Sequence, residues 1–149
     1  MNLIIEQGNS RVKIAVFHER QLMHMAVLPE ANNIQETLEK HIHKYPVQHA
    51  IVSWLDENNE IKNFLEKKNI QVIPFNYATK TPVNNWYETP QTLGKDRIAA
   101  VAGANCLYPR KNTLIIDAGT AITYDYIDAT GNYHGGNISP GLQMRFKAL

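Results

Sequence analysis

Hydrophobic positions recur with two different periods along this 149-residue chain. Short apolar runs bounded by Gly, Pro or Asn predict strands, whereas apolar residues spaced three or four apart predict amphipathic helices. The runs predict strands at residues 3–5, 12–17, 22–28, 50–54, 71–73, 114–116, 121–127 and from 133 onward. The helical spacing predicts helices at 34–43, around 61–65 and at 92–107, with an irregular loop at 76–90. Strands that alternate with helices indicate an α/β fold with parallel strands.

The most informative feature is a repeated segment. Residues 3–8 read LIIEQG and residues 114–119 read LIIDAG, so each copy is an apolar strand that ends in an acid, one spacer and a glycine. A hydroxyl residue follows each copy, Ser10 or Thr120, and a second strand comes next. Agreement in both motif and following pattern favours duplication over chance. We therefore expect a first lobe at 1–112 and, at 113–149, the three-strand start of an incomplete second lobe.

Each repeated turn has a composition that suits phosphate and Mg²⁺. Glycine lets the backbone approach phosphate oxygens, and successive N–H groups form an anion-binding nest. The acid would hold a cation or its bound waters, because it repels phosphate. Two ordinary hairpins with polar tips are the alternative interpretation, and the sequence leaves both open. The P-loop and dinucleotide-binding fingerprints are absent from the sequence.

A second cluster, Gly94-Lys95-Asp96-Arg97, lies at the start of the Ala-rich predicted helix and shortly after Tyr87. An acid in the first turn of a helix complements the helix dipole. Alternatively, Asp96 is a base and the adjacent Arg97 binds an anion. Sequence spacing does not choose between these two interpretations.

Composition narrows the class of partner. Fifteen Lys and Arg against fourteen Asp and Glu leave a net charge of +1, and no segment gathers a basic patch. This balance argues against nucleic acid or an anionic membrane as the main partner. The apolar runs are too short to span a bilayer, and the N-terminus does not resemble a signal peptide. The single cysteine, Cys106, excludes an internal disulfide and is predicted to be a core thiol, and we expect a cytoplasmic protein.

Four motifs together resemble the type III pantothenate kinases, and they occur in the order found in that family. They are Glu6–Ser10, Tyr87 with Gly94–Arg97, Asp117–Ala121, and Gly135–Gly141. The resemblance spans residues 6–141, which is nearly the whole chain. It implies the fold of the actin/Hsp70/sugar-kinase superfamily: α/β, with duplicated ribonuclease-H-like (actin-like ATPase) lobes, the second incomplete here.

The resemblance also implies an activity, the ATP-dependent phosphorylation of pantothenate to 4′-phosphopantothenate in the first step of coenzyme A biosynthesis. Asp96 would be the catalytic base, and Asp117 would bind a monovalent cation, K⁺ or NH₄⁺. Thr120 would contact ATP, and Mg²⁺ would be held through water near Glu6. The implied pantothenate contacts are Tyr87, Gly94, Lys95, Asp96 and Arg97. The implied phosphate loop consists of Glu6, Gln7, Gly8, Asn9, Ser10, Arg11, Val12 and Lys13. By the same resemblance we expect a homodimer.

Two departures from the family pattern are visible. The first motif usually opens with Asp, and this chain has Glu6, whose side chain is one methylene longer. Chains of the family also continue well past the Ser139-Pro140-Gly141 motif, and the continuation carries a further substrate-contacting threonine. We therefore expect low activity from these 149 residues alone. Uncovered apolar faces at 121–127 and 133–139 predict that the chain either associates through that surface or exchanges elements with a partner copy. Two alternative functions are a non-enzymatic transcriptional accessory factor and another kinase or ATPase of the superfamily.

Overall fold

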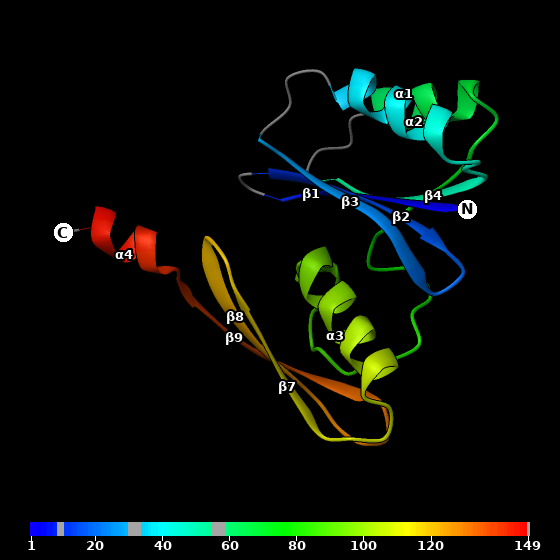
Figure 1. The fold of residues 1–149 in the computed structure, drawn as a ribbon. Coiled ribbons are helices and arrows are strands. Elements are labelled where there is room, and N and C mark those ends of the chain that lie inside the picture. Colours follow the sequence, from blue (N-terminus) through cyan, green and yellow to red (C-terminus); the bar gives the residue numbers. More distant parts are fainter. Residues whose placement is uncertain (9–10, 30–33, 55–58, 149) are drawn as a thin grey trace. The chain divides into compact units, whose positions relative to one another are not determined.

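A computed structural model describes residues 1–8, 11–29, 34–54 and 59–148 (Figure 1). The chain forms two compact units, Met1–Phe75 and Asn76–Leu149. The boundary between these units lies before the Ala-rich helix. The lobe boundary predicted at residue 112 was instead based on the sequence repeat. That lobe boundary stays a prediction.

Unit 1 contains a five-stranded sheet in the order β3-β2-β1-β4-β5. Its strands are β1 (Asn2–Gln7), β2 (Arg11–His18), β3 (Gln21–Pro29), β4 (His49–Ser53) and β5 (Gln71–Pro74). Strands β1, β4 and β5 are parallel, as expected, but β1, β2 and β3 are antiparallel. The expectation of parallel strands was wrong for the β1–β2 and β2–β3 pairs, and also for the pairs formed by residues 113–140 in unit 2. Connections of only a few residues join strands antiparallel, whereas a parallel neighbour needs a long crossover.

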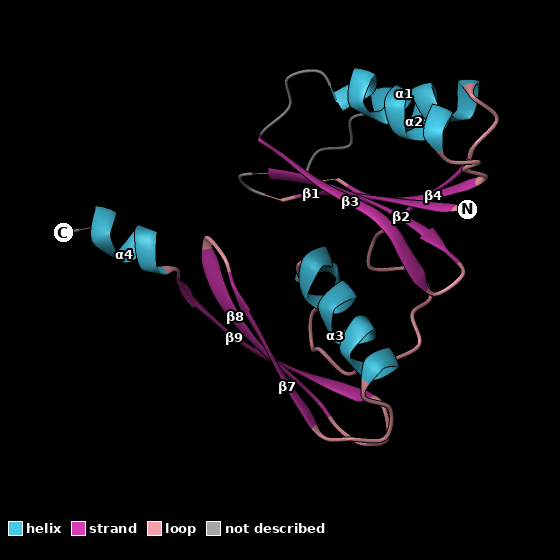
Figure 2. Ribbon diagram, in the orientation of Figure 1, coloured by secondary structure: helices cyan, strands magenta, loops and turns pink. Residues whose placement is uncertain are grey.

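Two helices, α1 (Ile34–Lys44) and α2 (Asn59–Lys67), lie on one face of this sheet (Figure 2). The alternation along β1 and β2 turns every second side chain toward them, and the fully buried core residues that the structure describes in this unit are apolar. Its members include Leu3, Ile5, Val12, Ile14, Val16, Leu38, Ile61 and Leu65, each at most 3% exposed. Burying one such side chain stabilises a fold by about 1.5–3 kcal/mol.

Unit 2 contains a four-stranded sheet in the order β6-β9-β8-β7. Its strands are β6 (Asn84–Asn85), β7 (Thr113–Ala118), β8 (Ala121–Ile127) and β9 (Asn132–Pro140). Helix α3 (Lys95–Leu107) contacts β7 and β8, and a short helix α4 (Leu142–Lys147) follows β9. Strand β6 pairs in parallel with β9 and was not predicted, because it is only two residues long and lies inside the irregular loop.

Helix α3 begins at Lys95, three residues later than predicted. A 3₁₀ turn occupies Pro90–Thr92, and the backbone of Leu93 and Gly94 is extended. Ile98 and Val101 are buried on the inner side of the helix, whereas Cys106 is exposed. The prediction of a core thiol was therefore wrong, because the position of Cys106 around the helix turns it away from that buried side.

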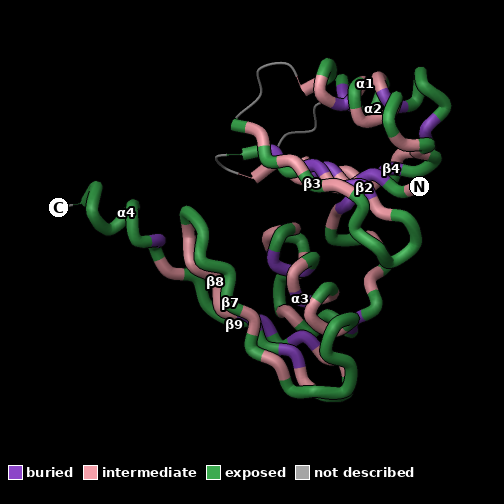
Figure 3. Tube along the Cα trace, in the orientation of Figure 1, coloured by how far each residue is buried: buried purple, intermediate pink, exposed green. Residues whose placement is uncertain are grey.

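Figure 3 shows that buried positions gather in the unit 1 sheet and where α3 meets the unit 2 sheet. By contrast, Leu114 and Ile116 of β7 are 60% and 57% exposed. No helix in the described parts of the chain is long and apolar enough to cross a bilayer.

Candidate functional site

The first predicted phosphate turn is the hairpin that joins β1 to β2 in unit 1. Glu6 and Lys13 are cross-strand partners, and their side chains form an ion pair with 2.9 Å between Oε2 and Nζ. The backbone N–H of Gly8 donates to the carbonyl oxygen of Arg11 at 2.9 Å. Asn9 and Ser10 lie outside the described residues.

Three other residues of this turn occupy different environments. Arg11 is exposed, whereas the side chain of Val12 belongs to the unit 1 core and leaves only its backbone for a ligand. The Oε1 atom of Gln7 is buried, and it has no hydrogen-bond partner among the described residues. A buried acceptor of this kind costs free energy until a donor reaches it.

The second predicted turn joins β7 to β8 in unit 2. Asp117 pairs in register with Thr123, and the Gly119 N–H donates to the Ala121 carbonyl at 3.0 Å. Asp117 and Thr120 are both exposed. The turn is thus a second hairpin with an acid at the end of its first strand, as the repeat predicts.

The Ser-Pro-Gly motif reaches this second turn through Gly141, whose N–H donates to the Thr120 carbonyl at 2.9 Å. A Cβ atom at Gly141 would lie 2.3 Å from the Thr120 oxygen and 2.4 Å from the Gly119 oxygen. Glycine is therefore required here, because any side chain would displace the turn. The Asp117–Ala121 and Gly135–Gly141 motifs are separate in sequence and form one local structure.

The Gly94–Arg97 motif forms the start of α3. A Cβ atom at Gly94 would come within 2.5 Å of an Asp96 carboxylate oxygen, so glycine leaves room for that carboxylate. Asp96 is exposed and lies in the first helical turn, and it forms no ion pair with another described residue. Lys95 is half-buried. The helix thus presents an accessible carboxylate at a position fixed by regular secondary structure.

The neighbouring Arg97 is buried, 4% exposed, and pairs with Asp125 of β8, 1% exposed. The Arg97 Nη2 donates to Asp125 Oδ1 at 2.6 Å, and Nε donates to both carboxylate oxygens at 3.0 and 3.2 Å. The Tyr133 hydroxyl also donates to Asp125 Oδ1, at 2.6 Å. Hydrogen bonding to Asp125 raises the pKa of Arg97, while burial and the same carboxylate raise the pKa of Tyr133.

Tyr87 lies over this buried group. The Arg97 guanidinium is 5.6 Å from the centroid of the Tyr87 ring, and the ring stacks at 6.3 Å on Tyr133. Gly135 adopts φ +90°, and a Cβ atom there would lie 2.8 Å from Cδ2 of Tyr87. Gly135 therefore leaves space for the Tyr87 ring and belongs to the same local structure as Arg97.

Asp125 and Tyr133 are functional candidates that the sequence interpretation missed. Asp125 is an acid at an inward-facing position of an otherwise apolar and hydroxyl-rich strand. Such a residue requires a buried partner, because an isolated buried carboxylate is very costly. That pattern was a usable signal, although the partner Arg97 is 28 residues away in sequence.

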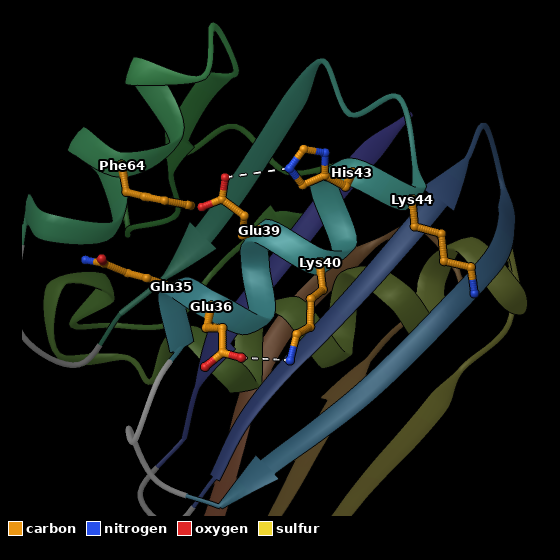
Figure 4. A pocket seen from close by; sticks show the side chains of 7 residues that line it. All are labelled: Gln35, Glu36, Glu39, Lys40, His43, Lys44 and Phe64. Atoms are coloured by element: carbon orange, nitrogen blue, oxygen red, sulfur yellow. Dashed lines mark hydrogen bonds and ion pairs between the residues drawn. The ribbon is translucent and has the colours of Figure 1, made fainter.

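A hollow of about 760 Å³ lies along α1 in unit 1 (Figure 4). Its charged groups pair along the helix, with Glu36 to Lys40 at 2.8 Å and Glu39 to His43 at 3.8 Å. Exposed pairs at this spacing are typical of a solvated helix surface. The sequence motifs of the predicted site lie elsewhere, so this hollow is not a site candidate.

Similarity to solved structures defines the class of fold. A phosphatase of the Ppx/GppA family from Aquifex aeolicus aligns over 99% of this chain and 54% of its own, with a TM-score of 0.55 and 16% identity. A Campylobacter jejuni protein described as belonging to the Baf family of transcriptional activators aligns over 98% of this chain and 58% of its own, with a TM-score of 0.56 and 25% identity. The predicted α/β fold with actin-like, ribonuclease-H-like lobes is thereby confirmed.

Sequence comparison then gives the family. The type III pantothenate kinase family matches residues 2–149. Type III pantothenate kinases from Phocaeicola vulgatus and Flavobacterium johnsoniae are 48% and 41% identical to the chain over 150 residues. The chain belongs to the type III pantothenate kinase family, which confirms the resemblance drawn from its four motifs. It spans 61% of the length of these two relatives.

Proposed function

We propose that the protein to which this chain belongs uses ATP to phosphorylate the terminal hydroxyl of pantothenate. The observation that carries the proposal is the exposed Asp96 carboxylate in the first turn of α3, next in sequence to Arg97, whose guanidinium lies 5.6 Å from the centroid of the Tyr87 ring. Membership of the family supplies the substrate and the reaction. Asp96 accepts a hydrogen bond from the substrate hydroxyl and takes its proton during transfer.

Placement of the reacting groups matters more than the strength of the base, because phosphoryl transfer has a loose transition state. The regular helix fixes the backbone of Asp96, and the absence of a side chain at Gly94 leaves room for its carboxylate. Arg97 is held by Asp125, so we propose that it contributes through the face of Tyr87, with which its guanidinium makes a cation–π contact. Tyr87 and Lys95 then contact pantothenate more directly than Arg97 does.

ATP, when bound, supplies the phosphoryl group, and Mg²⁺ neutralises part of its charge. The first turn fits these groups. Gly8 lets the backbone approach phosphate, Lys13 supplies positive charge, and the unsatisfied Gln7 Oε1 suits a metal-bound water as donor. The Glu6 carboxylate would help hold that hydrated cation.

In unit 2, Thr120 would contact ATP, and the exposed Asp117 would bind K⁺ or NH₄⁺. Carboxylate and carbonyl oxygens are suitable ligands for such cations, and the turn that carries Asp117 is fixed by Gly119 and Gly141. We also propose a homodimer, as the resemblance implies, and a cytoplasmic location, as the composition and the single cysteine predict.

The proposal is tested in a chimera in which the part of the Phocaeicola vulgatus relative outside the matched region completes this chain. We expect pantothenate-dependent consumption of ATP, and Asp96→Asn should lower turnover by about 10²–10⁴-fold. The substitution should change the free energy of unfolding by at most about 1 kcal/mol, which is the size of a helix-dipole contribution. Glu88→Gln, an exposed acid in the same unit, is the matched control and should leave turnover unchanged. Full turnover in Asp96→Asn would remove Asp96 from the reaction.

A further inference from the structure

We propose that Asp125 and Tyr133 are positioning residues for the substrate, and that they act by holding the ring of Tyr87 in one orientation. This role rests on the proposed function, in which Tyr87 contacts pantothenate. Asp125 and Tyr133 are 1% and 0% exposed, so neither side chain is open to a ligand. Tyr87 is half-buried and therefore leaves part of its side chain accessible.

The Asp125 carboxylate links two other elements of unit 2. It lies on β8 and accepts hydrogen bonds from Arg97 of α3 and from the Tyr133 hydroxyl of β9. Two guanidinium nitrogens, Nε and Nη2, donate to it, and such a two-point contact fixes the plane of the guanidinium as well as its distance. An ionised carboxylate only accepts, so the Tyr133 hydroxyl is the donor and its direction is fixed too. One buried acid thus sets the positions of two side chains.

Those two side chains both contact the Tyr87 ring. The Arg97 guanidinium is 5.6 Å from the ring centroid, and the Tyr133 ring lies nearly parallel to the Tyr87 ring, at 7° and with 6.3 Å between centroids. Both distances are within the range of favourable cation–π and offset-stacked contacts. Each contact depends on orientation, so the Tyr87 ring adopts the orientation that Arg97 and Tyr133 favour.

Tyr87 needs such support because it lies outside regular secondary structure, two residues after strand β6. Its backbone N–H donates to Asn85 Oδ1 at 3.0 Å. The N–H of the preceding Trp86 donates to the Tyr133 carbonyl at 2.9 Å. The backbone is therefore held, and the freedom that is left is rotation of the Tyr87 side chain, which the cation–π and stacking contacts restrict.

The expected kinetic signature is a loss of affinity for the substrate. A ring that is held in advance avoids the cost of ordering it on binding. In the proposed reaction Tyr87 contacts pantothenate and moves no proton, so its contact is the same in the ground state and the transition state. Loss of such a contact raises KM and leaves kcat nearly unchanged. A variant of Asp96, by contrast, should lower kcat.

Steady-state kinetics on the chimera with the Phocaeicola vulgatus relative test the proposal, at a temperature at which circular dichroism shows each variant to be folded. Tyr133→Leu removes the stacked ring and the hydroxyl, and should raise the KM for pantothenate about threefold to tenfold, the size of one aromatic contact. Asp125→Asn should have a similar effect, because it weakens the hold on Arg97. The KM for ATP and kcat should stay nearly unchanged. Tyr133→Phe keeps the ring and should recover most of the affinity.

Val101→Ala is the matched control, because it removes buried apolar atoms from the same unit and leaves the hydrogen bonds of Asp125 in place. It should lower stability without a change in KM. Fluorine NMR of the chimera with a fluorotyrosine in place of Tyr87 adds a readout that needs no turnover. The line of the parent chimera should be displaced from that of the unfolded chain, and Tyr133→Leu should move it toward the unfolded position.

Equal KM values in Tyr133→Leu and Val101→Ala, or an unmoved fluorine line, would overturn the proposal, as would a loss confined to kcat. A chimera without pantothenate-dependent turnover would instead contradict the proposed function. The fluorine line would then still decide whether Asp125 and Tyr133 hold the Tyr87 ring.

Discussion

The two repeated hairpins have nearly the same sequence and opposite surroundings. Leu3 and Ile5 of β1 are completely buried, whereas the matching Leu114 and Ile116 of β7 are 60% and 57% exposed. Both pairs occupy alternate positions of an antiparallel hairpin that ends in an acid and a glycine. The apolar pattern therefore determines the strand and which side chains share a face, but not whether that face is covered.

The difference follows from what each unit places beside its hairpin. In unit 1, α1 and α2 pack against the face that carries Leu3 and Ile5, and β4 pairs with the free edge of β1. In unit 2, α3 covers the face that carries Asp125, whose register partner on β7 is Ile115. Leu114 and Ile116 point to the opposite face, and β7 ends the sheet order. Among the described residues, no segment covers them as α1 and α2 cover their counterparts.

The two units also differ in what they bury. The buried core of unit 1 is apolar, whereas unit 2 buries Arg97 and Asp125 among the described residues. A buried ion pair stabilises weakly as a pair, but the loss of one partner is costly because the other charge stays buried. Unit 2 therefore depends on a specific pairing where unit 1 depends on apolar area.

The largest expected effect is that of Asp125→Ala on unit 2. Leaving the Arg97 guanidinium buried without its partner should cost about 3–5 kcal/mol of unfolding free energy. Urea unfolding followed by the fluorescence of Trp86 in a Trp54→Phe background reports on unit 2, because Trp86 lies there. Asp117→Ala, an exposed acid on the adjacent strand, should change stability by no more than about 0.5 kcal/mol. Equal losses in the two variants would show that the buried pair is not what stabilises unit 2.

The second prediction compares equivalent positions of the repeat directly. Ile5→Ala should destabilise unit 1 by about 2–5 kcal/mol, because it removes buried methylenes and leaves a cavity. Ile116→Ala should change the stability of unit 2 by no more than about 0.5 kcal/mol, because its side chain already contacts solvent. Trp54, which packs against the unit 1 core, and Trp86 report on the two units in single-tryptophan backgrounds. A large loss in Ile116→Ala would mean that another polypeptide covers that face in solution.

Association through the uncovered face is the third prediction. Leu114, Ile116 and the 38% exposed Tyr126 are neighbours on one side of the β7–β8 pair. We expect concentration-dependent association of the parent chain by light scattering, because burial of this apolar area is favourable. Ile116→Lys should lower the association constant at least tenfold. Met25→Lys, at a 60% exposed position of edge strand β3, is the matched control. A monomeric parent chain at high concentration would contradict the prediction.

The fold was largely predictable because its signals are local. The alternation in β2 and β8 and the helical spacing at 34–43 correspond to the observed strands and helix α1. The two-residue strand β6 gave no periodic signal, and Cys106 was misplaced because burial depends on which side of α3 meets the sheet. The motifs of the candidate site could be identified from the sequence. The ion pair between Arg97 and Asp125 could not, because its two residues are 28 positions apart.

The smallest expected effect concerns the alkaline stability of unit 2. Burial and the hydrogen bond to Asp125 raise the pKa of Tyr133 above its ordinary value of 10.0. The native state therefore keeps the Tyr133 hydroxyl proton at a pH where the unfolded chain releases it. The contribution of this hydroxyl to the free energy of unfolding is complete below pH 10 and decreases as pH rises toward the native pKa. By pH 11 the loss in the free energy of unfolding should be about 1.4 kcal/mol, with a slope that approaches about 1.4 kcal/mol per pH unit. Unfolding of unit 2, followed by Trp86 between pH 9 and 11, should show this slope in the parent chain and lack it in Tyr133→Phe. Parallel pH dependences in the two proteins would show that the Tyr133 hydroxyl is not held by Asp125 in solution.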